Sequence, residues 1–165
     1  MIKNIVNVDV EKLNGFCEKV VDSKFYIGDN EIYFVDGKNV VLNYSQKEKD
    51  IALWFSAKFG KVVFMNPKIN FPKGINTSDY TIDGESWDLK CLGKNAKSNK
   101  RAVDNLLKNS KNQAANFIID ITETILSENI VLNQTKNIFL DIKRTWVKKI
   151  IIIKNNELIA FFQRI

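Results

Sequence analysis

The sequence predicts a mixed α/β fold (α+β, with a mixed sheet) in which helices flank one sheet. Two observations lead to this class. After residue 44, segments with helical and strand-like apolar spacing interleave as helix, three strands, helix, strand, helix and two strands, an order typical of a sheet covered by helices. The 165 residues are 45% hydrophobic and 11% aromatic, enough for one domain with a substantial core.

The first 44 residues are expected to form an appendage on a domain that spans residues 45–165. Apolar positions at helical spacing predict a helix over residues 9–22. Two apolar segments, 31–35 and 39–43, flank Asp36-Gly37 and predict a hairpin. No apolar run in the chain reaches transmembrane length, and the start lacks the apolar region of a secretory signal, so we expect any export to use another route or a longer chain.

The next predicted helix begins at a capping box. Ser45 and Glu48 have the spacing of an N-cap and an N3 residue, and Gly60 is placed to end the helix as its C′ residue. Its apolar side is expected to consist of Ile51, Ala52, Trp54, Phe55 and Phe59.

Three strands should follow this helix. The first is a buried strand over residues 61–65, and a loop over residues 66–78 holds both prolines. Strands over residues 80–82 and 87–91 flank an Asp83-Gly84 turn. On the last strand, alternation places Asp88 and Lys90 on one face, and Trp87, Leu89 and Cys91 on the core face.

The remaining elements are a basic helix over residues 99–109, a central strand over 117–121, and a helix within 126–146. A hairpin with strands over 147–153 and 158–162 turns at Asn155-Asn156. The apolar side of the third helix is expected to contain Ile138, Phe139, Ile142 and Trp146.

Composition excludes several chemistries. The chain has no histidine, which rules out histidine acid–base catalysis, Ser-His and Cys-His nucleophile pairs and histidine-bound zinc. Cys17 and Cys91 are far apart beside apolar residues and are expected to be buried free thiols. Carboxylates, Lys, Tyr, Ser or a metal must therefore carry any catalysis.

The net charge of +6 is concentrated in residues 90–111, which contain seven basic residues and one acidic residue, Asp104. Such a segment suggests a phosphate-rich partner. A lysine-rich surface from an AT-rich genome explains the charge equally well.

Residues 45–121 contain an ordered set of positions, namely Glu48, Gly60, Val62-Val63-Phe64, Pro72 with Gly74, Asp79-Tyr80, Ile82-Asp83-Gly84, Trp87-Asp88-Leu89-Lys90, Asn105, Gln113-Ala114 and Phe117-Ile118-Ile119-Asp120. With this set the segment resembles the restriction-endonuclease-like nucleases, whose core of helix, three strands, helix and strand carries a PD…(D/E)xK pattern. Within that superfamily it resembles the C-terminal tRNA-nuclease toxin domain of CdiA contact-dependent growth-inhibition proteins. Ser78 replaces the usual proline of the pattern.

The resemblance implies a catalytic set of Glu48, Asp79, Asp88 and Lys90. Asp79, Asp88 and Glu48 would hold a divalent cation, Mg²⁺ being favoured because it prefers oxygen ligands. Lys90 would orient the attacking water or stabilise charge on the phosphate. The residues that would bind nucleic acid are Lys97, Lys100, Arg101, Lys108, Lys111 and Gln113.

Several of these residues have a structural alternative. Glu48 is equally explained as the N3 residue of the capping box. Asp83 is read as the turn residue, with a ligand role as the alternative, and Asp120 as a cap for the next segment. The basic residues would serve equally as a solvated helix face, and Gln113 as the start of a strand.

The function implied by the resemblance is that of a metal-dependent endoribonuclease toxin with tRNA as the favoured substrate. It would act in the bacterial cytoplasm after delivery within a secreted toxin, and an acidic immunity protein would cover its basic cleft. A DNA endonuclease of the same fold, or a non-catalytic domain that binds nucleic acid or protein, are the alternatives.

Overall fold

The computed structural model describes residues 2–4, 19–96 and 100–165. These residues form two compact units. The N-terminal unit consists of residues 19–88, and the C-terminal unit consists of residues 2–4, 89–96 and 100–165. The units do not follow the boundary predicted after residue 44, because strands before that position pair with strands after it.

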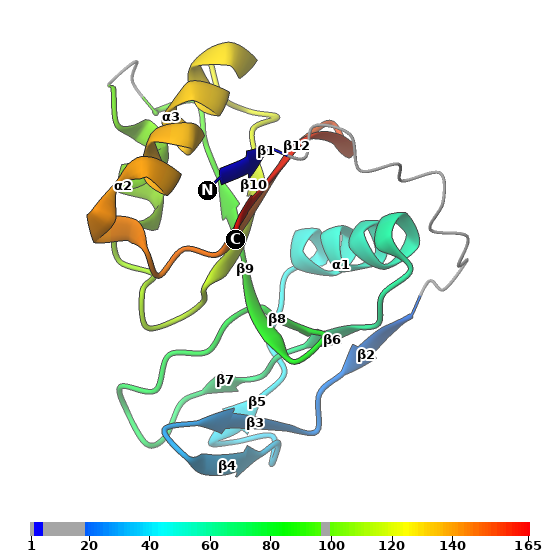
Figure 1. Cartoon of the computed structure of the whole chain (residues 1–165). Coiled ribbons are helices and arrows are strands. Elements are labelled where there is room, and N and C mark those ends of the chain that lie inside the picture. Colours follow the sequence, from blue (N-terminus) through cyan, green and yellow to red (C-terminus); the bar gives the residue numbers. More distant parts are fainter. Residues whose placement is uncertain (1, 5–18, 97–99) are drawn as a thin grey trace. The chain divides into compact units, whose positions relative to one another are not determined.

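The N-terminal unit holds one helix, α1 (Gln46–Phe59), and a mixed sheet. The sheet contains β2 (Val20–Asp22), β6 (Val63–Met65), β8 (Tyr80–Ile82) and the start of β9 (Glu85–Cys91), in that order. β2 runs parallel to β6, whereas the β6–β8 and β8–β9 pairs are antiparallel (Figure 1). β9 then continues into the C-terminal unit.

The capping signals of α1 are confirmed. Ser45 is the N-cap, both halves of the capping box are formed, and Gly60 ends the helix in the left-handed conformation. The helix buries Ile51, Ala52, Phe55, Ser56 and Phe59. Phe55 contacts Trp87 of β9 with a ring-centroid separation of 5.4 Å, which fixes the helix against the sheet.

The pairing predicted between residues 31–35 and 39–43 is wrong. β4 (Glu31–Phe34) pairs instead with β3 (Phe25–Gly28), across a tight turn whose two residues have positive φ, Asp29 and Asn30. β5 (Val40–Val41) pairs with β7 (Lys68–Ile69). Asp36 does form a turn, but its carboxylate accepts three backbone N–H groups and so closes a local loop rather than a hairpin.

The helix predicted over residues 9–22 is corrected at its end, since residues 20–22 form strand β2. Residues 9–18 of that helix, and Cys17 with them, lie outside the described residues.

The C-terminal unit contains helices α2 (Ala102–Leu107) and α3 (Glu128–Leu140). Its strands are β1 (Ile2–Asn4), β12 (Glu157–Arg164), β11 (Lys149–Lys154) and β10 (Asn116–Asp120), in that sheet order. β10 is parallel to β11 and all five of its residues are buried, which confirms the predicted central strand. The β11–β12 hairpin at Asn155-Asn156 is also confirmed, and β1 lies beside β12 (Figure 1).

Three details of this unit differ from expectation. α3 ends at Leu140, because Asp141 adopts an extended conformation and caps a short 3₁₀ helix, η2 (Ile142–Arg144), and Ile142 is therefore exposed rather than part of an apolar stripe. α2 begins only at Ala102. Cys91 is exposed rather than buried.

No helix in the described residues has the length and apolarity needed to cross a membrane.

Candidate active site

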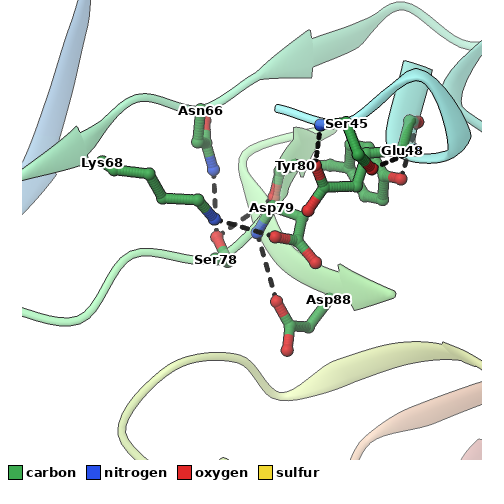
Figure 2. A network of polar contacts seen from close by, with 8 residues as sticks. All are labelled: Ser45, Glu48, Asn66, Lys68, Ser78, Asp79, Tyr80 and Asp88. Atoms are coloured by element: carbon green, nitrogen blue, oxygen red, sulfur yellow. Dashed lines mark hydrogen bonds and ion pairs between the residues drawn. The ribbon is translucent and has the colours of Figure 1, made fainter. Parts of the chain in front are cut away.

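Asp79 and Asp88 come together at the end of the β8–β9 hairpin. The Asp83-Gly84 turn sets the register, with Tyr80 opposite Trp87 and Thr81 opposite Ser86. Continuing the register by one residue sets Asp79 opposite Asp88. The backbone N–H of Asp79 donates to Asp88 Oδ1 at 3.3 Å, as Figure 2 shows. The structure therefore joins the two acids that the resemblance named.

Burial gives this pair unusual electrostatics. Asp88 is only 1% exposed, and the Asp79 side chain is 10% exposed. Two carboxylates in a region of low dielectric repel each other strongly and favour a cation beside them. Asp88 is therefore buried on its face of β9 rather than exposed to solvent.

Lys68 provides such a cation. Its ammonium lies 2.9 Å from Asp79 Oδ1, and the two side chains point toward one another (Figure 2). Burial acts to lower the pKa of Lys68. The attraction and hydrogen bond of Asp79, with the charges of Glu48 and Asp88, outweigh burial and raise that pKa above its ordinary value. Lys68 thus sits within the field of three acids.

Glu48 is held by the helix start. Its backbone N–H donates to Ser45 Oγ at 3.1 Å, and its carboxylate accepts the backbone N–H of Ser45. The Tyr80 hydroxyl donates to the Glu48 carbonyl oxygen at 2.8 Å, which ties the helix start to β8. The capping interpretation of Glu48 is confirmed, and its role as a third catalytic acid stays a prediction.

A buried polar network supports Asp79 from the other side. The Asn66 amide donates to Ser78 Oγ at 3.0 Å and accepts from Thr81 Oγ1 at 3.0 Å. The backbone N–H of Asn66 donates to the Asp79 carbonyl oxygen at 2.9 Å. Ser78, which replaces the proline of the pattern, is fully buried and also donates to the Tyr80 carbonyl oxygen. The segment before Asp79 is therefore fixed by hydrogen bonds.

Asp83 acts as a turn residue. It has a φ of 51°, it precedes Gly84 at the tip of the hairpin, and its carboxylate pairs with Lys61 at 2.9 Å. The Asp83 side chain is 60% exposed. This agrees with the preferred prediction for this residue.

The other predicted residues lie in the C-terminal unit. Lys90 is half-buried on β9, two positions after Asp88, so the two share a face of the strand. Among the residues predicted to bind nucleic acid, the basic ones that the structure describes are exposed, namely Lys100, Arg101, Lys108 and Lys111. Arg101 pairs with Asp104. Gln113 is half-buried in the turn before β10, so it does not start that strand, and Lys97 lies outside the described residues. Asp120 accepts the N–H and hydroxyl of Thr122, as its capping interpretation predicts.

The donor chemistry of the acid pair fits a hard cation, because carboxylate oxygens are the ligands that Mg²⁺ takes. Among the residues that the structure describes, no group of three or more Asp, Glu, His or Cys side chains is gathered closely enough to hold a metal ion. The structure thus brings together two of the three predicted ligands. Glu48 as a third ligand remains a prediction.

Sequence reasoning missed Lys68 and Asn66. Both lie in the segment that was expected to be loop, and both reach the site through contacts between residues 11 to 15 positions apart. No local pattern marks such contacts.

Comparison with solved structures shows the same fold in a chain of the "CdiA-CT/CdiI toxin and immunity complex from Burkholderia pseudomallei". The two chains share 17% identity over 88% of this chain and 99% of that chain, with a TM-score of 0.53. At this identity the likeness concerns the fold. No curated protein matches the sequence.

Comparison of the sequence with models of protein families gives a match. The model of the contact-dependent growth inhibition CdiA C-terminal domain matches residues 76–159. This range includes Asp79, Asp88 and Lys90, and it extends from the loop before β8 into β12. It covers just over half of the 165 residues. The chain therefore belongs to the contact-dependent growth inhibition CdiA C-terminal domain family.

Proposed function

We propose that this chain is a metal-dependent endoribonuclease of the PD-(D/E)xK type that acts as a toxin, with tRNA as its favoured substrate. The observation that carries the proposal is the buried pair of Asp79 and Asp88 on adjacent strands, in a member of the CdiA C-terminal domain family. Lys90 follows two residues after Asp88, so the motif of two acids and a lysine is complete on one hairpin.

Each residue of the proposed active site has a defined task in the mechanism. Asp79 and Asp88 would hold the divalent cation, which when bound polarises the scissile phosphate and lowers the pKa of a bound water. Glu48 is the proposed third acid, positioned by the capping box. Lys90 would orient the attacking water and stabilise the negative charge that develops on the phosphate. Lys68 neutralises Asp79 and so keeps the acids compatible with folding.

Substrate binding would rely on the exposed cations of the C-terminal unit. Lys100, Arg101, Lys108 and Lys111 can contact backbone phosphates without reading sequence, and Lys97 and Gln113 remain proposed members of this set. Binding of this kind is expected to weaken steeply with salt.

The proposal includes a partner and a destination. The similar structure is that of a toxin with its immunity protein, which supports an immunity protein for this chain as well. That partner should be acidic where it meets the basic cations, since opposite charge speeds association. The toxin would be delivered within a secreted CdiA protein and would act in the cytoplasm of the target cell.

The test incubates the full chain with total tRNA and with plasmid, each with Mg²⁺ or with EDTA. Discrete tRNA fragments that appear only with Mg²⁺ are the expected result, and Asp88→Asn should produce none. Plasmid nicking with intact tRNA would replace the proposal with a DNA endonuclease. Binding of tRNA with no cleavage of either substrate would leave a non-catalytic binding domain.

A further inference from the structure

The N-terminal unit contains a cavity beside the acid pair whose walls are aromatic and whose floor is polar. Its volume is about 610 Å³, and its lining includes Phe25, Tyr26, Phe64, Asn66, Ser78 and Thr81. We propose that this cavity binds one unpaired base of the RNA substrate next to the scissile phosphate. This inference rests on the proposed function, whose substrate recognition it specifies.

The aromatic walls suit a flat ligand. Phe25 belongs to β3 and Phe64 to β6, and they are 46% and 40% exposed although both are large and apolar. Ile27, which also lines the cavity, is 62% exposed. Exposed apolar side chains gathered around one hollow mark a binding surface. Single-stranded RNA is recognised mainly by stacking its bases on such rings.

The polar floor suits the edge of a base. The Asn66 amide is held in one orientation, because its oxygen accepts from Thr81 and from Ser23 and its nitrogen donates to Ser78. Amide and hydroxyl groups offer both donors and acceptors, which is the chemistry that reads the edge of a nucleobase.

The cavity and the acids are built on the same elements. Ser78 lines the cavity and directly precedes Asp79. Ser86 lines it as well, and Asp88 lies two residues further on β9, on the same face of the strand. A base held here would therefore place its own phosphate close to Asp79 and Asp88.

The cavity also has the charge and the room for a nucleotide. Two side chains of opposite charge, Lys24 and Asp22, line it, and the Lys24 ammonium would pair with a phosphate. The volume falls in the range of small-molecule sites and accommodates a purine with its ribose.

The test measures binding without cleavage. The full chain with Asp88→Asn is mixed, in EDTA, with a hexaribonucleotide that carries one 2-aminopurine, whose fluorescence falls when it stacks. We expect quenching on binding, and a loss of affinity of about 5- to 100-fold when Phe64→Ala is added. Phe64→Leu keeps apolar volume but removes the ring, so it should also abolish quenching. Leu53→Ala, an exposed apolar residue of α1 with 37% exposure and no place in the cavity lining, should change neither signal.

The outcomes separate this inference from the proposed function. Unchanged affinity and quenching in both Phe64 variants, with melting temperatures near that of the parent, would overturn base binding even if the wild-type chain cleaves tRNA. Base binding that depends on Phe64 would stand even if no cleavage were found. An apolar dye that fills the cavity without competition from the oligonucleotide would assign it to an apolar partner and overturn the inference.

Discussion

Replacing Lys68 with Met tests the electrostatics of the acid pair. Met keeps most of the side-chain length and removes the ammonium that lies 2.9 Å from Asp79. The Asp79 carboxylate would then be left buried beside Asp88 without that ammonium. We expect the variant to be less stable than the wild type, and to regain stability when a divalent cation replaces the lost charge.

The magnitude follows from burial. Removing one partner of a fully buried ion pair costs about 3–5 kcal/mol, and an exposed pair contributes about 0.2–1 kcal/mol. Lys68 is 33% exposed and Asp79 only 10%, so the expected loss is about 2 kcal/mol. For a chain of this length that loss lowers the melting temperature by about 4–8 °C. Mg²⁺ at ten times its dissociation constant would restore about 1.4 kcal/mol.

The pH dependence of the loss has a definite sign. The pKa of Lys68 is raised in the folded chain, because the acids outweigh burial. Its stabilisation is therefore fully present below the unfolded pKa of lysine and disappears only as pH rises through the folded pKa. The difference between wild type and variant should stay constant from neutral pH to about pH 9.

The assay is thermal unfolding with and without Mg²⁺, with Lys61→Met as the matched control. Lys61 forms an ion pair of the same length with Asp83, but the two side chains are 45% and 60% exposed. The control should lose less than about 1 kcal/mol and should gain nothing from Mg²⁺. Equal losses in both variants, or no recovery of Lys68→Met by Mg²⁺, would refute the reasoning.

Three further predictions concern the acids. Asp88→Asn keeps the acceptor for the Asp79 N–H group and removes a buried charge. Cleavage of tRNA should therefore vanish while the melting temperature stays within about 2 °C. A large loss of stability with residual cleavage would contradict a catalytic role. In Glu48→Gln the amide oxygen can still accept the Ser45 backbone N–H, so the variant should lose less than about 1 kcal/mol of stability but should not cleave tRNA. Ser45→Ala should lose about 1 kcal/mol of stability and keep its cleavage activity. Equal activity in the two variants would make Glu48 a cap alone. The Arg144 hydrogen bond lowers the pKa of Asp104, with burial opposing it. Asp104→Asn should therefore lower the free energy of unfolding by about 1–2 kcal/mol at neutral pH, and urea unfolding should show this loss disappear as pH falls below about 4. A loss that persists in acid would exclude the charge as its source.

Local signals in the sequence were sufficient for much of the fold. The capping box at Ser45 and Glu48 and the turn at Asp83-Gly84 act through backbone conformation and contacts within a few residues, so the local sequence was enough to predict both. The turn also sets the register of its hairpin, which is why the spacing of Asp79 and Asp88 around it is enough to predict that the two acids lie together.

Local signals failed where two turns competed. Asp36-Gly37 is the stronger hairpin pattern, yet the chain pairs β3 with β4 across Asp29-Asn30 and sends β5 to β7. Helical spacing also failed to predict the end of a helix. It placed Ile142 on the apolar side of α3, but the helix ends at Leu140.

The sequence by itself determined the α+β class and most of the element order after residue 44, because these depend on periodicity and turns. It also determined that Asp79 and Asp88 lie together, through the register of one hairpin, while their predicted role came from the family resemblance. Only the tertiary structure decided that Asp88 is buried, that Lys68 neutralises Asp79, and that an aromatic cavity lies beside them. The physical reason is that burial and ion pairing depend on which distant segments pack together. Spacing along the chain does not record that choice.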